Sequence, residues 1–191
     1  MKLLTIACSL VMMLFFQNVI AKEHSHFDEQ AQKAIKEFAI ALKAALGEAM
    51  EKGGPIEAIP VCSKVAPTIA KELSDKYGMT IGRTSLKVRN PANKPDSWEE
   101  AVLQQFEQRK AQGESVTSLV YSGQRVDDHQ DEQWRMMKAI PTAKLCLPCH
   151  GSNIDAPVQT VLDKLYPDDK ATGFSLGDIR GAFSVHKIKT R

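Results

Sequence analysis

Two cysteines and a histidine stand in a fixed register late in the chain, in the segment Cys146-Leu147-Pro148-Cys149-His150. Two thiols separated by two residues can each add to one vinyl group of a porphyrin and form two thioethers. The histidine that follows directly is then placed under the ring, where it can ligate the iron. The motif therefore predicts one covalently attached haem c, with Cys146 and Cys149 as the thioether residues and His150 as the proximal iron ligand.

Two other interpretations of this motif are half of a zinc ribbon and a thioredoxin-like redox pair. A zinc ribbon needs a second pair of closely spaced cysteines, and the sequence contains no such pair. A thioredoxin-like motif follows a buried strand and opens a helix, whereas Pro148 and Gly151 predict a loop at this point. Haem attachment is the favoured interpretation, provided that the chain is exported.

The first 21 residues have the pattern of a secretory signal peptide. Lys2 supplies the positive charge, residues 3–16 are almost entirely apolar, and Val19-Ile20-Ala21 resembles a cleavage site. The apolar run is short for a membrane span, although a retained N-terminal anchor is the alternative. Cys8 lies inside the run rather than after it, which argues against a lipid anchor. We therefore expect export to a bacterial periplasm, where haem is attached covalently.

The remaining residues, 22–191, suit a single domain with its own hydrophobic core. The chain has 25 Lys and Arg residues against 23 Asp and Glu residues, with no basic or acidic block. This balance gives no sign of a nucleic-acid partner. No other apolar stretch is long enough to cross a bilayer, so we expect no membrane span after signal cleavage.

Cys62 is left without an intramolecular disulfide partner once Cys146 and Cys149 are used for haem attachment. A lone thiol in an oxidising compartment is buried, pairs across a dimer or binds a metal. Thiolate is a strong ligand for ferric iron, so Cys62 could be the distal ligand of the haem iron. Simple burial of the thiol in the core stays open as the alternative. Other candidates for the distal position are histidines and methionines, namely His24, His26, His129, His186, Met50, Met79, Met136 and Met137.

The spacing of apolar residues predicts helices first and then mostly strands. A helix over about residues 27–52 has an Ala-rich apolar face, which would also suit a homodimer, and glycines at 53 and 54 end it. A second helical region, 56–76, carries Cys62 and is interrupted by Pro60 and Pro67. The other predicted elements are strands over 80–88, 115–121, 133–141 and 178–187, and helices over 97–112 and 156–165. This order predicts an α+β fold with antiparallel strands, unlike the all-helical fold of ordinary cytochromes c.

Several separated motifs resemble a known family, the PAS-like c-type haem domain with mixed His/Cys axial ligation, which is often catalogued as a domain of unknown function. The resemblance covers roughly residues 38–185. The motifs that carry it are Cys62 followed by Ala66-Pro67, Ile81-Gly82-Arg83-Thr84-Ser85-Leu86, Arg89-Asn90-Pro91-Ala92-Asn93, Cys146-Leu147-Pro148-Cys149-His150-Gly151 and Gly177-Asp178-Ile179-Arg180-Gly181-Ala182-Phe183-Ser184-Val185.

The resemblance implies a PAS-like antiparallel sheet flanked by helices. It implies His150 as the proximal iron ligand and Cys62 as the distal one. Members of such a family occur both as free-standing exported proteins and fused to sensor kinases, so redox or gas sensing is often inferred for them. No pattern of a kinase or other output module is found among these 191 residues, so direct signalling is not expected of them.

Arg83, Arg89 and Arg180 stand within the resembling motifs. Guanidinium groups match carboxylates with two parallel hydrogen bonds, so these arginines are candidate contacts for the haem propionates. The alternative is that they fasten loops to the sheet by binding backbone carbonyls.

The sequence thus predicts an exported monohaem protein that acts in one-electron transfer or redox sensing rather than catalysis, with an unidentified redox partner protein. One alternative is a haem-based sensor of a diatomic gas such as NO or CO. A peroxidase-like enzyme is another, and it needs an acid/base group that His129 or His186 would have to supply. In a third alternative the domain is structural and haem only stabilises its fold.

Overall fold

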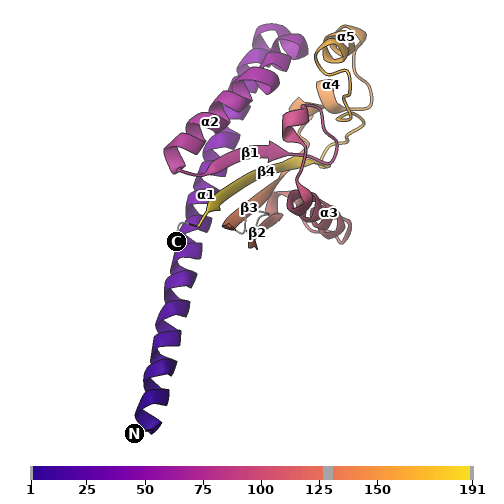
Figure 1. Cartoon of the computed structure of the whole chain (residues 1–191). Helices are drawn as coiled ribbons and strands as arrows, with labels where there is room; N and C mark the ends of the chain where they lie inside the picture. The colour runs from indigo at the N-terminus through magenta and orange to yellow at the C-terminus, as the bar shows by residue number, and fades with distance from the viewer. Residues whose placement is uncertain (1, 127–130, 190–191) are drawn as a thin grey trace.

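The computed structural model describes the backbone of residues 2–126 and 131–189, with side chains from residue 23 onwards in those ranges. Its centre is a four-stranded antiparallel sheet in the order β1-β4-β3-β2. Helices cover both faces of this sheet (Figure 1). The strands are β1 (Thr80–Thr84), β2 (Val120–Val126), β3 (Glu132–Pro141) and β4 (Ile179–Ile188). The expected α+β class, with a PAS-like antiparallel sheet flanked by helices, is confirmed.

The helices lie between and around these strands. They are α1 (Lys2–Pro60), a π-helix (Val61–Val65), α2 (Ala66–Tyr77), α3 (Ser97–Ala111), α4 (Leu147–His150) and α5 (Ala156–Leu165). Short 3-10 turns cover Pro91–Asn93, Val116–Ser118 and Lys144–Cys146. Among the residues that the structure describes, none of the helices combines the length and apolar character that crossing a bilayer requires.

The long N-terminal helix was predicted, but α1 extends further than residues 27–52 in both directions. It begins at Lys2 because no glycine or proline occurs among the first 46 residues. At its other end the helix kinks where the glycines were expected to end it. Gly54 adopts φ 71° and ψ −157°, a conformation open mainly to glycine, and the chain then resumes a helical path to Pro60.

Helices α1 and α2 cover one face of the sheet and α3 covers the other. The cluster under α1 joins its buried Phe27, Ile35 and Phe38 to Phe183 and Val185 of β4. On the opposite face, the buried α3 residues Val102, Leu103 and Phe106 pack on the sheet. Their partners are Met137 and Ala139 of β3 and Ala182 of β4. Burial of these two apolar sets on opposite faces fixes the sheet between the helices.

Three predicted elements differ from the observed ones. The first strand ends at Thr84 instead of residue 88. The Ser85 hydroxyl has one proton, which it shares between the carbonyls of Arg180 at 2.8 Å and Lys87 at 3.0 Å, and this local contact turns the chain. The strand predicted over 115–121 is a 3-10 turn followed by β2, which begins at Val120. The chain also stays helical through Pro60 and Pro67 rather than being interrupted.

Candidate functional site

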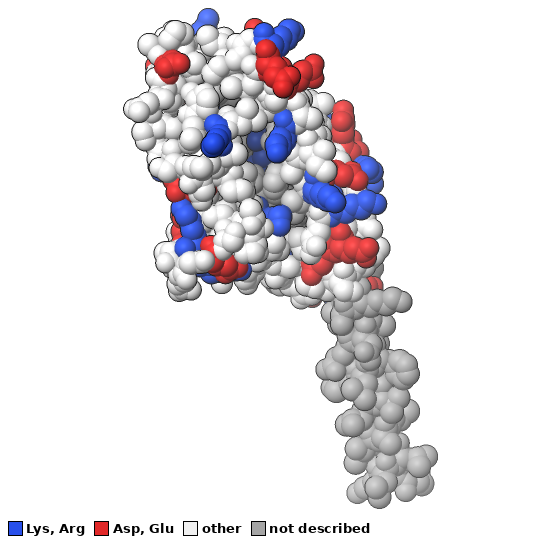
Figure 2. Space-filling model, turned by 180° about the vertical axis from the view of Figure 1, so that it is seen from behind, with Lys and Arg blue, Asp and Glu red and all other residues white. Residues whose placement is uncertain are grey.

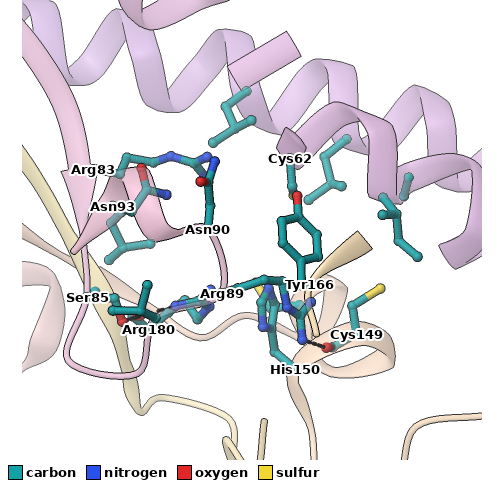
Figure 3. A pocket seen from close by; sticks show the side chains of 18 of the residues that line it. Cys62, Arg83, Ser85, Arg89, Asn90, Asn93, Cys149, His150, Tyr166 and Arg180 are labelled. Atoms are coloured by element: carbon teal, nitrogen blue, oxygen red, sulfur yellow. Dashed lines mark hydrogen bonds between the residues drawn. The ribbon is translucent and has the colours of Figure 1, made fainter. Parts of the chain in front are cut away.

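A pocket lies where four parts of the fold meet (Figure 3). They are the C-terminal part of α1, the π-helix, the end of β1 and the segment around α4 and α5. It contains about 1130 Å³ of space including its open mouth. In the view from behind, a hollow in the upper part of the surface is bordered by Lys and Arg side chains (Figure 2). Apolar residues of α1 form one wall, namely Leu42, Leu46, Met50, Ala58 and Ile59.

The pocket brings together the residues that the sequence singled out for haem chemistry. Its lining includes all the described cysteines, the histidine of the motif and the candidate propionate arginines, namely Cys62, Cys146, Cys149, His150, Arg83, Arg89 and Arg180. No Asp or Glu occurs among the described residues that line it. Met50 also lines the pocket, although nothing in its sequence context distinguished it.

The motif forms one helical turn, not the loop that Pro148 and Gly151 predicted. In α4, Pro148 stands near the N-terminus, where its missing N–H breaks no helical hydrogen bond. The Gly151 amide closes the turn on the Leu147 carbonyl at 2.8 Å, and a Cβ on Gly151 would lie 2.7 Å from that oxygen. Because residues three apart share one face of such a turn, Cys146 and Cys149 both reach the pocket.

His150 is buried and its tautomer is set by one hydrogen bond. Its Nδ1 lies 2.7 Å from the carbonyl oxygen of Ala171. Burial, together with the positive charges of Arg180 and Arg89, lowers the pKa of His150 to about 2, so the ring is neutral at physiological pH. Nδ1 must then donate its proton to the carbonyl, which leaves the lone pair on Nε2. This is the form of histidine that ligates a metal.

Arg89 fastens the segments around His150 to one another. It forms a buried ion pair with Asp169 at 2.8 Å, the two side chains being 7% and 8% exposed. The same Nη2 donates to the carbonyls of Cys149 and Ala171 at 2.6 and 3.2 Å. These contacts match the loop-fastening alternative for Arg89. Asp169 and Ala171 were not identified from the sequence, because their partner lies about 80 residues away along the chain.

Arg83 and Arg180 lack a carboxylate partner among the described residues. The guanidinium of Arg180 lies 3.2 Å from the Ser85 hydroxyl and stacks over the Phe174 ring at 5.2 Å. That of Arg83 lies over the Phe38 ring at 5.8 Å. Burial lowers the pKa of both, to about 10 for Arg180, where the charges of Arg89 and Arg83 add to the effect. Two uncompensated cations in a pocket are suited to a ligand with carboxylate groups.

Cys62 enters the pocket from the π-helix, across from His150 (Figure 3). The local cause of the π-helix is Pro67. In an α-helix its amide would bond the Ser63 carbonyl, and its ring clashes with that oxygen. The turn widens instead, and the Ala66 amide donates to the Val61 carbonyl five residues earlier. π-Helical turns within helices occur frequently at functional sites.

Apart from Met50, the competing histidines and methionines among the described residues do not line the pocket. His186 belongs to β4, where burial and the charge of Arg135 lower its pKa, and it does not line the pocket. Met136 and Met137 are fully buried in the two clusters that cover the sheet. His24 makes an edge-to-face contact with the Trp134 ring, and His26 is exposed near the N-terminus. His129 lies outside the described residues.

Comparison with known proteins gives one family and one related structure. The family model described as Tll0287-like matches residues 13–187. The crystal structure of the cyanobacterial heme-protein Tll0287 superposes with a TM-score of 0.61 and is 23% identical in sequence, covering 89% of this chain and 97% of its own. This likeness bears out the fold. No curated protein matches the sequence. Since the family model spans most of its length, the chain belongs to the Tll0287-like family.

Proposed function

We propose that this chain is an exported monohaem c-type protein that acts in one-electron transfer or redox sensing. The observation that carries the proposal is the meeting of a neutral His150 and two thiols on one wall of a pocket with a third thiol on the other. A haem supplies an iron that alternates between the ferric and ferrous states. The related Tll0287 is described as a heme-protein, which supports the same cofactor here.

The residues that line the pocket fit each part of a haem c. The thiols of Cys146 and Cys149 would form the thioethers, and Nε2 of His150 would ligate the iron. The apolar residues of α1 suit the faces of a porphyrin, and Arg83 and Arg180 would bind its propionates. Arg89 already uses Nε and Nη2 for Asp169 and two carbonyls, so its part is to support the proximal wall.

Cys62 is proposed as the distal ligand in the ferric state. Its side chain faces the space opposite His150, and Arg83 lines the same pocket. Thiolate donates electron density and favours ferric iron. The reduction potential is therefore expected to be lower than with His/Met ligation. Reduction would weaken the bond between the iron and Cys62. The oxidation state of the iron would then influence the position of the helical segment that carries Cys62.

The alternative activities have less support. A peroxidase-like enzyme needs an acid/base group beside the reacting ligand. His150 is the only histidine among the described lining residues, which contain no carboxylate. A gas sensor for NO or CO would require departure of Cys62 from the iron.

The test compares haem-loaded wild type with Cys62→Ala. We expect the substitution to abolish the absorption and electron-resonance signature of thiolate ligation in the ferric protein. Met50→Leu changes another side chain of the same pocket and should keep that signature. The Cys146→Ser/Cys149→Ser double variant should lose haem staining in a denaturing gel, because no thioether remains. Ferric spectra that are the same with and without Cys62 would contradict the proposed ligation.

A further inference from the structure

A histidine occupies the third position after the expected cleavage site, in the run Lys22-Glu23-His24. An N-terminal amine, the next two backbone amides and the Nδ1 atom of a histidine at that position can close adjacent chelate rings around one metal ion. These nitrogens then lie in a single plane. Cu(II) and Ni(II) prefer such square-planar coordination by nitrogen, and Cu(II) binds more tightly than Ni(II).

Cleavage after Ala21 would release the two backbone amides that this chelate needs. Helix α1 continues through residues 19–24 without a break (Figure 1). Each amide of an α-helix donates to the carbonyl four residues earlier, so Glu23 and His24 use the carbonyls of Val19 and Ile20. Both carbonyls leave with the signal peptide. The two amides then belong to the first turn of the shortened helix, where amides have no partner within the helix.

The imidazole of His24 is only loosely held. Its Nδ1 atom lies 3.5 Å from the carboxylate of Asp28, and the two side chains are each 29% exposed. A partly exposed ion pair of this length contributes little to stability. Asp28 keeps another partner, because it also accepts a hydrogen bond from Ser122 of β2. Nδ1 can therefore exchange Asp28 for a metal ion at small cost.

The chelate also requires residues 22–24 to leave the helical conformation. The first residue of α1 in the described core is Phe27, which follows them and is 2% exposed. Glu23 is exposed, and His24 touches the core only through its edge-to-face contact with Trp134. Since helix ends fray readily, the first turn can open while Phe27 stays in place.

Side chains alone offer no comparable site in the described part of the chain, where no group of three or more His, Cys, Asp or Glu residues could hold a metal ion. Binding of Cu(II) through the backbone releases one proton from the ammonium group and one from each amide, and the metal is not reduced. The two negative amide nitrogens cancel the charge of the ion. No net positive charge is therefore added at the helix N-terminus, where a cation is unfavourable.

We propose that the mature chain binds one Cu(II) ion through the Lys22 amine, the amides of Glu23 and His24, and Nδ1 of His24. This inference rests on the export that the proposed function includes, since it needs cleavage after Ala21. It does not depend on which residues ligate the haem iron. Zn(II), which prefers tetrahedral coordination, should compete poorly for this site.

The experiment uses the haem-loaded protein recovered from the periplasm of a bacterial host, with its first residue identified by N-terminal sequencing. Cu(II) is titrated against a chelating dye, and electron resonance reports the ligands of the bound ion. We expect one Cu(II) per chain with the signature of square-planar nitrogen coordination. His24→Ala should weaken binding by more than about a hundredfold, because loss of a residue that merely supports a metal ligand already costs about 10- to 100-fold. His26→Ala changes an exposed histidine nearby and should bind as the wild type does.

A second pair of variants tests the backbone ligands. Glu23→Pro and Glu23→Ala both remove the carboxylate, but only proline also removes the N–H that copper must displace. Glu23→Pro should therefore bind Cu(II) as weakly as His24→Ala, whereas Glu23→Ala should keep the wild-type affinity. A site made of the side chains of His24, His26 and Asp28 would give the opposite pattern, with binding lost in His26→Ala and kept in Glu23→Pro.

Equal Cu(II) affinity of wild type and His24→Ala, or of the two Glu23 variants, would overturn the inference. A mature chain that begins at a residue other than Lys22 would overturn it as well, and would leave the haem ligation untouched. The haem proposal fails on its own test, when Cys62→Ala leaves the ferric spectra unchanged, and that result would not affect the copper site.

Discussion

The carbonyl of Ala171 links the chemistry of His150 to the buried charge pair behind it. It accepts from Nδ1 of His150 and from Arg89, whose charge is matched by Asp169. Asp169 also accepts a hydrogen bond from the Ala171 amide at 2.8 Å. Both backbone groups of Ala171 are therefore bound by the ion pair, the amide by Asp169 and the carbonyl by Arg89. The orientation of the imidazole therefore depends on a carboxylate that does not contact it.

We expect Asp169→Asn to lower the free energy of unfolding by about 3–5 kcal/mol, because it leaves the Arg89 charge buried and unpaired. Urea denaturation at neutral pH measures this loss. Asp168→Asn changes the exposed neighbouring residue and should have little effect. Equal stabilities of the two variants would show that the Arg89–Asp169 pair does not hold this part of the fold.

At the scale of elements, the residue that caps the N-terminus of α3, Asp96, also binds the sheet. The carboxylate of Asp96 accepts the Glu99 amide at 2.8 Å, and Glu99 accepts the Asp96 amide at 3.0 Å, which completes a capping box. The same carboxylate lies 2.6 Å from the buried Arg135 of β3. Burial alone would raise the pKa of Asp96, but the Glu99 amide and the Arg135 guanidinium outweigh it and hold the pKa below its usual value.

This lowered pKa makes the contribution of Asp96 dependent on pH. A carboxylate with a depressed pKa stabilises the fold fully above about pH 4, and the effect disappears as the pH falls through the folded-state pKa. Asp96→Asn can keep the cap and removes the charge, so it should reduce stability by about 1 kcal/mol at neutral pH, given that Asp96 is partly exposed.

Urea denaturation of wild type and Asp96→Asn at neutral pH and at about pH 2 tests this prediction. The difference between the two proteins should vanish at the acid end. Glu100→Gln removes an exposed carboxylate in the same helical turn and serves as the control. A difference that stays constant with pH would mean that the charge of Asp96 plays no part.

At the scale of the whole molecule, α1 extends well beyond the domain that it helps to build (Figure 1). The first of its residues in the described core is Phe27, which is 2% exposed and packs with Trp134 at 5.9 Å between ring centroids. The expected cleavage site after Ala21 precedes this residue. Removal of the signal peptide would therefore leave every described core contact in place.

We expect the protein recovered from the periplasm of a bacterial host to begin at Lys22, as N-terminal sequencing would show. A chain of residues 22–191 should have nearly the melting temperature of the full-length chain, because the core begins at Phe27. A shorter chain that starts after Phe27 is the contrasting variant and should melt at a lower temperature. Recovery of uncleaved protein in the membrane fraction would favour a retained anchor instead.

Local sequence signals predicted the elements that have clear ends. The helices over 97–112 and 156–165 and the last strand agree with α3, α5 and β4 within one residue. The predictions failed where side chains from distant segments intervene. Ser85 ends β1 through the Arg180 carbonyl, about 95 residues away, and no local pattern can indicate such a contact.

The sequence by itself predicted the chemistry of the motif, because the spacing of Cys146, Cys149 and His150 fixes their relation within a single turn of backbone. It also singled out Cys62 by counting thiols. Only the tertiary structure decided that Cys62 and His150 face one pocket, and that Arg89 has a carboxylate partner among the described residues while Arg83 and Arg180 have none there. These relations depend on burial and on charges from segments far apart in the chain, and folding alone brings such segments together.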